Sequence, residues 1–283
     1  ENLDAVILCT WPMQHAQQID QCIKAGIKNI LCEKSLALSA SEALAIWQLS
    51  RQSGAFIMEA CKHRHHPAIR KIEQLLANGE SARVDSIHTA FSNYEPDEQS
   101  DADFSADWRF KKECGGGVPY DWMSYLVNAC NCFSGSLPKR VFASGSVGEK
   151  SGVVTRIFGE IEYENGVVGF IESSKEASFS EDLQIACANV RISLPIAWGI
   201  YGGVTIRQTR RKPEWDYILT DAFEIGEANA FELQLQNFVQ VIRKKEKPVM
   251  PLWESVVNVQ TIDALVTSMI EGIVVPMDFS GLL

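Results

Sequence analysis

The first sixty residues alternate between short apolar runs and longer amphipathic segments. The runs at 4–9, 29–32 and 55–58 are nearly continuous, which is typical of strands buried on both faces. Residues 15–25 and 39–52 carry apolar side chains at helical spacing, and a glycine follows each segment. The second segment opens with an S-x-x-E capping box. Strand and helix in alternation with short connections predict a parallel sheet with right-handed crossovers.

From about residue 83 the pattern becomes one of alternating apolar and polar residues, which is typical of antiparallel strands. Strands are predicted at 84–91, 140–147, 153–163, 167–174, 183–194, 204–209 and 216–219. The sequence Glu164-Asn165-Gly166 predicts a tight hairpin, because Asn-Gly accepts the positive φ angles of such a turn.

Two amphipathic helices are predicted after the last strand. The first has an apolar stripe made of Phe231, Leu235, Phe238 and Ile242. The second covers 254–271 and ends at a glycine. The fold class is therefore α/β, with a small parallel sheet in residues 1–61 followed by an α+β domain in residues 62–283 that holds a large, mostly antiparallel sheet.

Composition excludes several classes of protein. The net charge of −10 argues against a nucleic-acid surface, because phosphate binding requires clustered Lys and Arg. The sequence contains no run of about eighteen apolar residues that could span a membrane, and no signal-peptide pattern at its start. Its eight cysteines lack disulfide-like spacings. We expect a cytoplasmic protein with neither nucleic acid nor membrane as a partner.

Charged residues follow one predicted strand, and a polar stripe marks one predicted helix. Glu33 and Lys34 come directly after the strand 29–32, at the sheet edge where open parallel sheets bind ligands. Three glycines, Gly115 to Gly117, then lead into a helix whose first turn holds Asp121. Tyr125 lies four residues further on, so it shares a helix face with Asp121.

These segments resemble the Gfo/Idh/MocA family of NAD(P)-dependent oxidoreductases, which includes sugar and cyclitol dehydrogenases. "TWPMQHAQQ" and "AGIKNILCEKSLA" resemble the family's T-P-x-x-x-H helix and its A-G-K-x-V-x-x-E-K-P signature. "MEACKHRHHPAIRKIEQLL" resembles its R-x-H-P helix, and "WRFKKECGGGVPYDWMSYLVN" resembles its W-R … G-G-G-x-x-x-D-x-x-x-H/Y segment. "NAFELQLQNFVQVIRKK" and "TIDALVTSMIEG" fit its last two helices. The glucose–fructose oxidoreductase and dihydrodiol dehydrogenase branches carry Tyr where most members carry His.

The resemblance implies a dinucleotide-binding (Rossmann) domain, of which residues 1–61 would be the C-terminal part, with NAD or NADP as the cofactor. It implies that Lys34 contacts the reacting hydroxyl and the nicotinamide ribose, that Glu33 lies near the nicotinamide, and that Asp121 orients the substrate. Tyr125 would be the acid–base group. Further cofactor contacts are expected from Thr10, Trp11 and His15. Further substrate contacts are expected from His66, Trp108, Arg109 and Asn128.

The pairing of Tyr125 with Lys34 has a physical reason. Oxidising a secondary alcohol requires removal of the hydroxyl proton as the hydride leaves, and a free tyrosine, with a pKa of about 10, is a poor base for this. A nearby ammonium favours the phenolate and lowers that pKa. Structural alternatives stay open, because Tyr125 could be a core tyrosine and Asp121 a helix-start residue only.

Other segments also have alternative interpretations. Trp108 and Arg109 could equally be a packed indole and a surface guanidinium. "CKHRHH", residues 61–66, contains zinc-ligand types, but no partner pair occurs elsewhere, so no metal site is expected.

The chain departs from the family pattern at three places. Ser35 stands where proline is usual, which removes a fixed φ from the Lys34 loop, and Trp11-Pro12 replaces Thr-Pro. The sequence also contains no G-x-G-x-x-G turn for a cofactor pyrophosphate, and it opens at what would be the fourth strand of the domain. Either the sequence begins downstream of the natural N-terminus or the phosphate cradle has been lost. The exposed edge of a half-sheet favours the first explanation.

We therefore expect an oxidoreductase that transfers a hydride between NAD(P) and a secondary hydroxyl or carbonyl of a sugar, sugar derivative, cyclitol or cyclic diol. The alternative is a non-catalytic relative that binds a sugar-like ligand or a partner subunit without the cofactor. By analogy with relatives, we also expect a homodimer or homotetramer formed through the antiparallel sheet.

Overall fold

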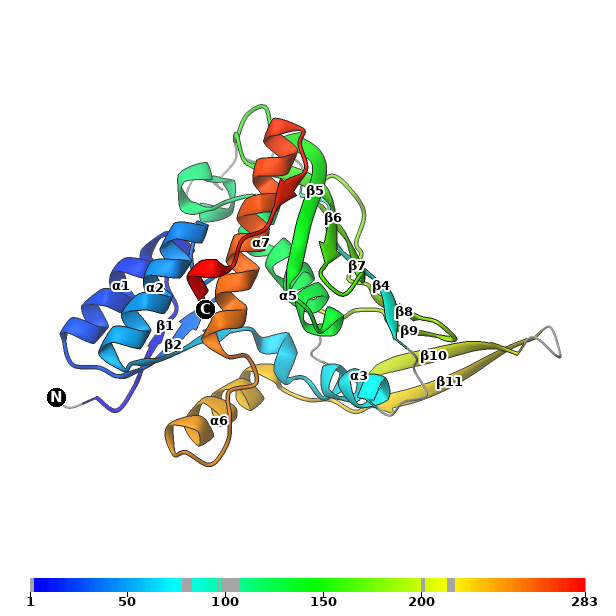
Figure 1. The fold of residues 1–283 in the computed structure, drawn as a ribbon, viewed down its shortest axis with the longest axis horizontal. Helices are drawn as coiled ribbons and strands as arrows, with labels where there is room; N and C mark the ends of the chain where they lie inside the picture. The colour runs from blue at the N-terminus through cyan, green and yellow to red at the C-terminus, as the bar shows by residue number, and fades with distance from the viewer. Residues whose placement is uncertain are drawn as a thin grey trace.

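A computed structural model describes residues 3–77, 83–95, 97, 107–199, 202–212 and 217–282. The first strands form a parallel sheet in the order β1 (Val6–Leu8), β2 (Asn29–Glu33) and β3 (Phe56–Ala60), as predicted. Helices α1 (Pro12–Lys24) and α2 (Ala40–Ser53) connect these strands (Figure 1). The carboxyl ends of all three strands therefore lie at one edge.

Local sequence signals account for the ends of these helices. Helix α1 begins at Pro12, three residues before the predicted start, because proline fits the first turn, where its missing N–H is not needed. Ser39 caps α2 by accepting the Glu42 amide at 3.2 Å, which confirms half of the capping box. The Glu42 carboxylate returns to the Leu38 amide rather than to that of Ser39. Gly54 ends α2 with a φ of 68°.

The second sheet is large and mostly antiparallel, as predicted. Within the described residues its strand order is β11-β10-β9-β8-β4-β7-β6-β5-β12, and only β4 and β7 pair in parallel. The strands are β4 (Val84–Ser92), β5 (Pro138–Val147), β6 (Val154–Tyr163), β7 (Val168–Ser174), β8 (Leu183–Cys187), β9 (Val190–Leu194), β10 (Val204–Lys212), β11 (Tyr217–Ile225) and β12 (Val275–Pro276). The segment predicted as a strand at 183–194 is thus two strands. The predicted Asn-Gly hairpin joins β6 to β7, and Gly166 has a φ of 85°.

Helix α7 (Leu252–Glu271) joins the two halves of the molecule (Figure 1). Val256 belongs to the core of the parallel sheet, whereas Leu265 belongs to the core of the large sheet. Helices α3 (Pro67–Ala77) and α5 (Met123–Ser134) also pack into the second core. Because one helix serves both cores, the domain boundary after residue 61 stays a prediction.

Helix α6 (Ala230–Ile242) corrects one expectation. Phe238 stacks on Phe56 of β3 with ring centroids 5.8 Å apart, and Ile242 packs into the same cluster. Phe231 and Leu235 belong to the same predicted stripe, yet they are 42% and 40% exposed. The stripe is helical, but it is buried only in its C-terminal half, where α6 meets β3.

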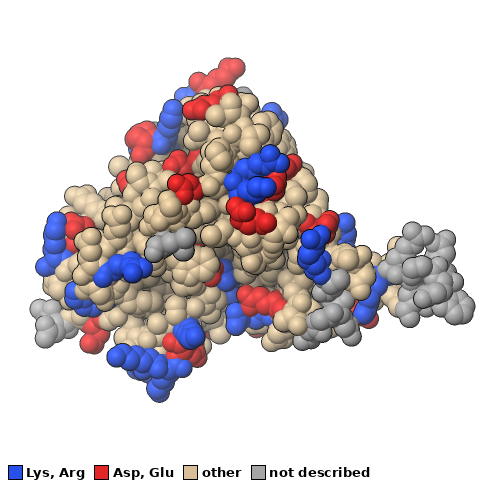
Figure 2. Space-filling model, in the orientation of Figure 1, with Lys and Arg blue, Asp and Glu red and all other residues tan. Residues whose placement is uncertain are grey.

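Two surface properties bear on partners. Figure 2 shows acidic and basic side chains interspersed over one face of the molecule, which is a poor surface for a polyanion. Within the described ranges, no helix combines the length and the apolar character that crossing a membrane requires.

Gly117 gives a test of the fold at the start of helix α4 (Val118–Asp121). Its φ is 89°, and an added Cβ would lie 2.5 Å from the Val154 carbonyl oxygen. Gly166 has a similar φ of 85° but no atom within 4 Å of an added Cβ. We expect Gly117→Ala to lower the free energy of unfolding by about 2 kcal/mol or more, and Gly166→Ala by about 1 kcal/mol. Urea denaturation measures both, and equal losses would contradict the predicted backbone clash.

Candidate active site

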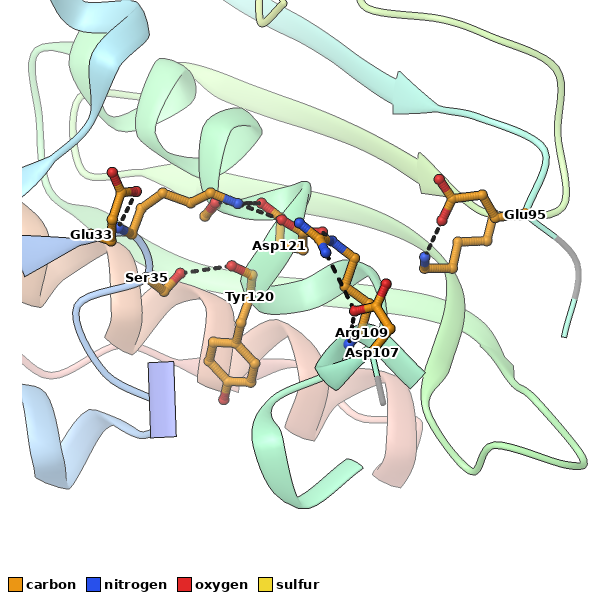
Figure 3. A network of polar contacts seen from close by, with 10 residues as sticks. Glu33, Ser35, Glu95, Asp107, Arg109, Tyr120 and Asp121 are labelled. Carbon is orange, nitrogen blue, oxygen red and sulfur yellow. Dashed lines mark hydrogen bonds and ion pairs between the residues drawn. The ribbon is translucent and has the colours of Figure 1, made fainter. Parts of the chain in front are cut away.

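The loop after β2 brings Lys34 to the start of the α4–α5 segment. Its Nζ donates to the Asp121 carboxylate at 2.5 Å and to the Asp121 carbonyl oxygen at 2.8 Å (Figure 3). The side chains of Lys34 and Asp121 are only 15% and 7% exposed. The two groups are 87 positions apart in sequence, and the fold makes them a buried ion pair.

Two further hydrogen bonds and a close contact tie this loop to α4. The Ser35 hydroxyl donates to the Tyr120 carbonyl oxygen at 3.0 Å (Figure 3). The Tyr120 hydroxyl donates to the Leu38 carbonyl oxygen at 2.6 Å. Gly115 lies so close to Leu38 that an added Cβ would approach a Leu38 methyl to 2.2 Å. Ser35 therefore lacks the fixed φ of proline, but its side chain supplies a tether that proline cannot make.

Asp121 also binds Arg109. The Arg109 Nε donates to the second carboxylate oxygen at 2.9 Å, and Arg109 is braced by Asp107 (Figure 3). Burial by itself favours the neutral acid, but Lys34 and Arg109 outweigh it and lower the pKa of Asp121. Burial likewise opposes the charge of Lys34, yet Asp121, Tyr125 and Glu33 raise the pKa of Lys34 to about 12. Both partners are ionised at neutral pH.

Tyr125 lies beside the ion pair, with the Lys34 Nζ 4.9 Å from the centre of its ring. Lys34 favours the phenolate, as expected from the sequence. Burial has the larger effect, however, and it raises the pKa of Tyr125 to about 12. The expectation of a lowered pKa is therefore wrong for the chain by itself, because the fold surrounds the phenol with protein atoms from distant segments, which the sequence does not indicate. Tyr125 carries its proton at neutral pH.

Three aromatic residues that the sequence did not assign to the substrate or cofactor site surround Tyr125. Its ring centre lies 5.3 Å from His63, 6.0 Å from Phe91 and 6.4 Å from Trp198. These residues come from a short 3-10 turn (Lys62–His65), from the end of β4 and from the loop after β9. No motif links such distant positions, so the sequence held no signal for this wall.

A third cation, Lys175, also acts on Asp121. Lys175 is 1% exposed, and its Nζ donates to Glu95 at 2.6 Å (Figure 3). The ammonium also lies 4.5 Å from the ring centre of Trp122 and 5.0 Å from that of Phe110. It lowers the pKa of Asp121 further, although less than Lys34 and Arg109 do. Sequence reasoning did not identify Lys175.

The predicted cofactor residues gather at the carboxyl edge of the parallel sheet. His15 is fully buried, and its two ring nitrogens lie 2.8 Å from the Ser35 carbonyl oxygen and 3.1 Å from that of Thr10. It therefore joins the loops after β1 and β2. Trp11 is 40% exposed at the start of α1. Glu33 is half-buried, and burial raises its pKa.

The fit of this edge to a nicotinamide cofactor rests on its open surface. Trp11 and Met13 are large apolar side chains that stand exposed at the start of α1, directly after β1. An apolar surface next to a charged loop suits the ring and ribose of a nicotinamide nucleotide.

The predicted substrate residues are divided between two environments. Trp108 is half-buried beside Arg109, whose guanidinium carbon lies 5.2 Å from the centre of the indole ring. Asn128 is buried and donates to the Met250 sulfur at 3.4 Å. His66 is fully buried and accepts the Ala68 amide at 3.1 Å, which makes it a cap for α3. Of these residues, only Arg109 bonds directly to the ion pair.

The "CKHRHH" segment forms part of the junction between the two sheets. Arg64 is buried and bonds to Glu254 of α7 at 2.8 Å, while His63 packs against Tyr125. Among the residues that the structure describes, no group of three or more His, Cys, Asp or Glu side chains is placed to hold a metal ion.

Family models match both parts of the chain. Residues 1–61 match the model "Oxidoreductase family, NAD-binding Rossmann fold", and residues 69–193 match the "GFO/IDH/MocA C-terminal domain". D-xylose 1-dehydrogenase (NADP(+)) 2 of Haloferax volcanii is 27% identical over 278 residues, which are 98% of this chain and 82% of that protein. Trans-1,2-dihydrobenzene-1,2-diol dehydrogenase of Mus musculus is 24% identical over 90% of this chain and 74% of its own length.

Solved structures share the fold. KijD10, a 3-ketoreductase from Actinomadura kijaniata in complex with NADP and TDP-benzene, has a TM-score of 0.82 at 21% identity. The match covers 94% of this chain and 78% of KijD10. The aldose-aldose oxidoreductase of Caulobacter crescentus has a TM-score of 0.84 at 18% identity, with coverages of 97% and 79%. With both of its domain models matched in order along the sequence, the chain belongs to the Gfo/Idh/MocA family of NAD(P)-dependent oxidoreductases.

Proposed function

We propose that this protein transfers a hydride between NAD or NADP and a secondary hydroxyl or carbonyl of a sugar, sugar derivative, cyclitol or cyclic diol. One observation carries the proposal: Lys34, Asp121 and Tyr125 meet beside the carboxyl edge of the parallel sheet. This edge is where open α/β sheets bind their ligands. A protonated phenol can act as the general acid in carbonyl reduction, and the buried, ionised lysine beside it can stabilise the negative charge that develops.

The bound nicotinamide supplies or accepts the hydride, and the side chains manage the proton. In the reducing direction, Tyr125 donates its phenolic proton to the substrate oxygen as negative charge develops there. Its raised pKa of about 12 keeps that proton in place at neutral pH. The Lys34 ammonium stabilises both the developing alkoxide and the phenolate that remains. In the oxidising direction, the phenolate of Tyr125 accepts the hydroxyl proton of the substrate, and the Lys34 ammonium stabilises that phenolate beforehand.

Asp121 acts through its two cationic partners. It keeps Lys34 charged and directs the ammonium toward Tyr125, and it holds the Arg109 guanidinium beside the same centre. Arg109 is 43% exposed and retains N–H groups that can bind substrate hydroxyls. The cofactor's nicotinamide half would lie against Thr10, Trp11, Glu33 and Lys34, with His15 joining the two loops from behind.

The walls of the site favour a cyclic substrate with several hydroxyls. Phe91, which is partly exposed, offers an aromatic surface beside Tyr125 that suits the apolar face of a ring, while the buried His63 and Trp198 pack against the phenol. Lys34, Asp121 and Arg109 supply the polar side of the site. The names of the relatives, a D-xylose dehydrogenase and a dihydrobenzenediol dehydrogenase, agree with such a ring.

The open face of the large sheet supports a homodimer or homotetramer. Phe142, Phe158 and Phe170 lie on neighbouring strands and are 44%, 43% and 37% exposed, and His88 stacks on Phe170 at 4.7 Å. A second copy of the chain would cover this apolar surface. All eight cysteines are free thiols, which supports a reducing compartment such as the cytoplasm.

Replacing the reacting groups tests the proposal. With D-xylose and NADP⁺ as the assay, we expect Lys34→Ala to lower kcat about 100-fold or more and Tyr125→Phe to lower it about 100- to 10,000-fold. Tyr163→Phe is a matched control, because it removes another buried phenol bond, 2.8 Å to Asn131, away from the site. It should keep its activity while losing about 1 kcal/mol of stability. Near wild-type turnover in Lys34→Ala would remove Lys34 from the mechanism.

Cofactor binding gives a second test. Titration of the protein with NADPH, and separately with NADH, should quench tryptophan fluorescence and enhance the fluorescence of the nucleotide, since Trp11 lies at the proposed site. Trp11→Phe should reduce the quenching, whereas Trp253→Phe, which changes a 43% exposed tryptophan at the start of α7, should leave the nucleotide signal unchanged. No response to either nucleotide in the wild-type protein would favour the non-catalytic alternative.

Introducing a charged residue on the exposed face of the large sheet tests the proposed oligomer interface. Phe158→Glu should shift the protein from dimer or tetramer toward monomer in sedimentation experiments, because a carboxylate would be buried in the apolar contact. Phe231→Glu introduces the same change at a 42% exposed phenylalanine on α6 and should have no effect. A monomeric wild-type protein would refute the proposed interface.

A further inference from the structure

A second buried carboxyl lies behind the Lys34 loop. Glu59, on β3, is 4% exposed, and its Oε1 accepts a hydrogen bond from the Leu36 amide at 2.9 Å. Glu59 stands opposite Cys32 in the β2–β3 pairing, so it lies level with the end of β2. This bond ties the loop that carries Lys34 to the neighbouring strand.

The rest of this carboxyl is poorly satisfied. Among the described residues, Glu59 Oε2 and the hydroxyl of Ser255, which faces it from α7, make no hydrogen bond of regular geometry, although the hydroxyl is close enough to counteract the rise in the pKa of Glu59. Both residues are buried. A buried polar atom without a partner lowers stability, so packing does not account for a carboxyl at this position. The one bond that it makes points to the loop.

The surroundings of Glu59 place its titration near neutral pH. Burial raises the pKa of Glu59 to about 7, against the opposing effects of Ser255, the Leu36 amide and Lys34. Glu33 on β2 raises that pKa further. The other titratable groups that face it are the thiols of Cys32 on β2 and Cys61 after β3.

We propose that Glu59 is a positioning residue, which fixes the Lys34 loop through the Leu36 amide and holds it more firmly as a carboxylate than as a neutral acid. A hydrogen bond to an ionised acceptor is about twice as strong as one between neutral groups. The loop, which holds Lys34 against Asp121, is therefore fixed most firmly above neutral pH, where Glu59 is ionised. It loosens as the pH falls and Glu59 gains a proton. Glu59 acts on the reaction only through Lys34.

The stability of the fold changes in the opposite direction. The pKa of Glu59 is higher in the folded protein than the ordinary value of 4.5, so its contribution to stability is fully present below pH 4.5 and is lost as the pH rises through about 7. Glu59→Gln removes this loss and retains an acceptor oxygen. We expect a higher Tm than the wild-type protein at pH 8 together with lower turnover. If Glu59 had only a structural role, Glu59→Gln would lower both the Tm and the turnover.

Hydrogen exchange tests the positioning role without any substrate. At pH 8 the Leu36 amide in Glu59→Gln should lose about fivefold of its protection relative to the wild-type protein, which corresponds to about 1 kcal/mol, and at pH 6 the two should converge. Asp263→Asn is a matched control, because the carboxylate of Asp263, on α7, also accepts a backbone amide, that of Ala40, at 3.0 Å. It should leave Leu36 unchanged. Equal protection of Leu36 at pH 8 in the wild-type protein and Glu59→Gln would overturn the proposal.

The activity measurement rests on the proposed function. In the oxidation of D-xylose with NADP⁺, kcat/KM rises with pH in both proteins because Tyr125 must lose its proton, so the ratio of the wild-type kcat/KM to that of Glu59→Gln is the readout. This ratio should rise as the pH passes through about 7, and a ratio that stays constant with pH would contradict the role of Glu59. If the wild-type protein does not turn over D-xylose while Leu36 exchange responds as expected, the positioning role stands and the proposed function is what fails.

Discussion

The buried ion pair between Lys34 and Asp121 is the interaction on which the rest of the site depends. The Lys34 Nζ lies 2.5 Å from the Asp121 carboxylate, so the pair joins the loop after β2 of the parallel sheet to helix α4, which belongs to the second part of the chain. A buried pair gains little net stability, because both charges lose water, but removing one partner costs about 3 to 5 kcal/mol since the other is left unpaired. Such a pair fixes the relation of the two sheets at the point where chemistry is proposed.

The groups around this ion pair determine one another's protonation states at neutral pH. The Lys34 ammonium is held by Asp121, the Asp121 carboxylate is held by Lys34 and Arg109, and Tyr125 keeps its proton because it is buried. The site is therefore charged on one side and ready to donate a proton on the other. Its loop is fixed from three directions, by His15, by Glu59 and by Tyr120.

Sequence reasoning could predict the parts that follow from local rules or from a motif. The parallel strands, the Ser39 cap, the Asn-Gly hairpin and the encounter of Lys34 with Asp121 belong to this class. The rest depends on burial and distant packing. The pKa of Tyr125 rises because the fold encloses it, and Lys175 and Trp198 reach the site from segments that follow β7 and β9 and carry no motif. Phe231 stays exposed because α6 meets β3 only through its C-terminal half.

A double-mutant cycle between Lys34 and Asp121 tests the central claim most directly. The rate constants kcat/KM for D-xylose and NADP⁺ would be measured for the wild-type protein, Lys34→Met, Asp121→Asn and the double variant. If Asp121 acts by holding Lys34, the double variant loses little more than Lys34→Met alone, and the coupling in the transition state is about 2 kcal/mol or more. Losses that simply add would show that the two groups work independently, and the ion pair would then not be the centre of the site.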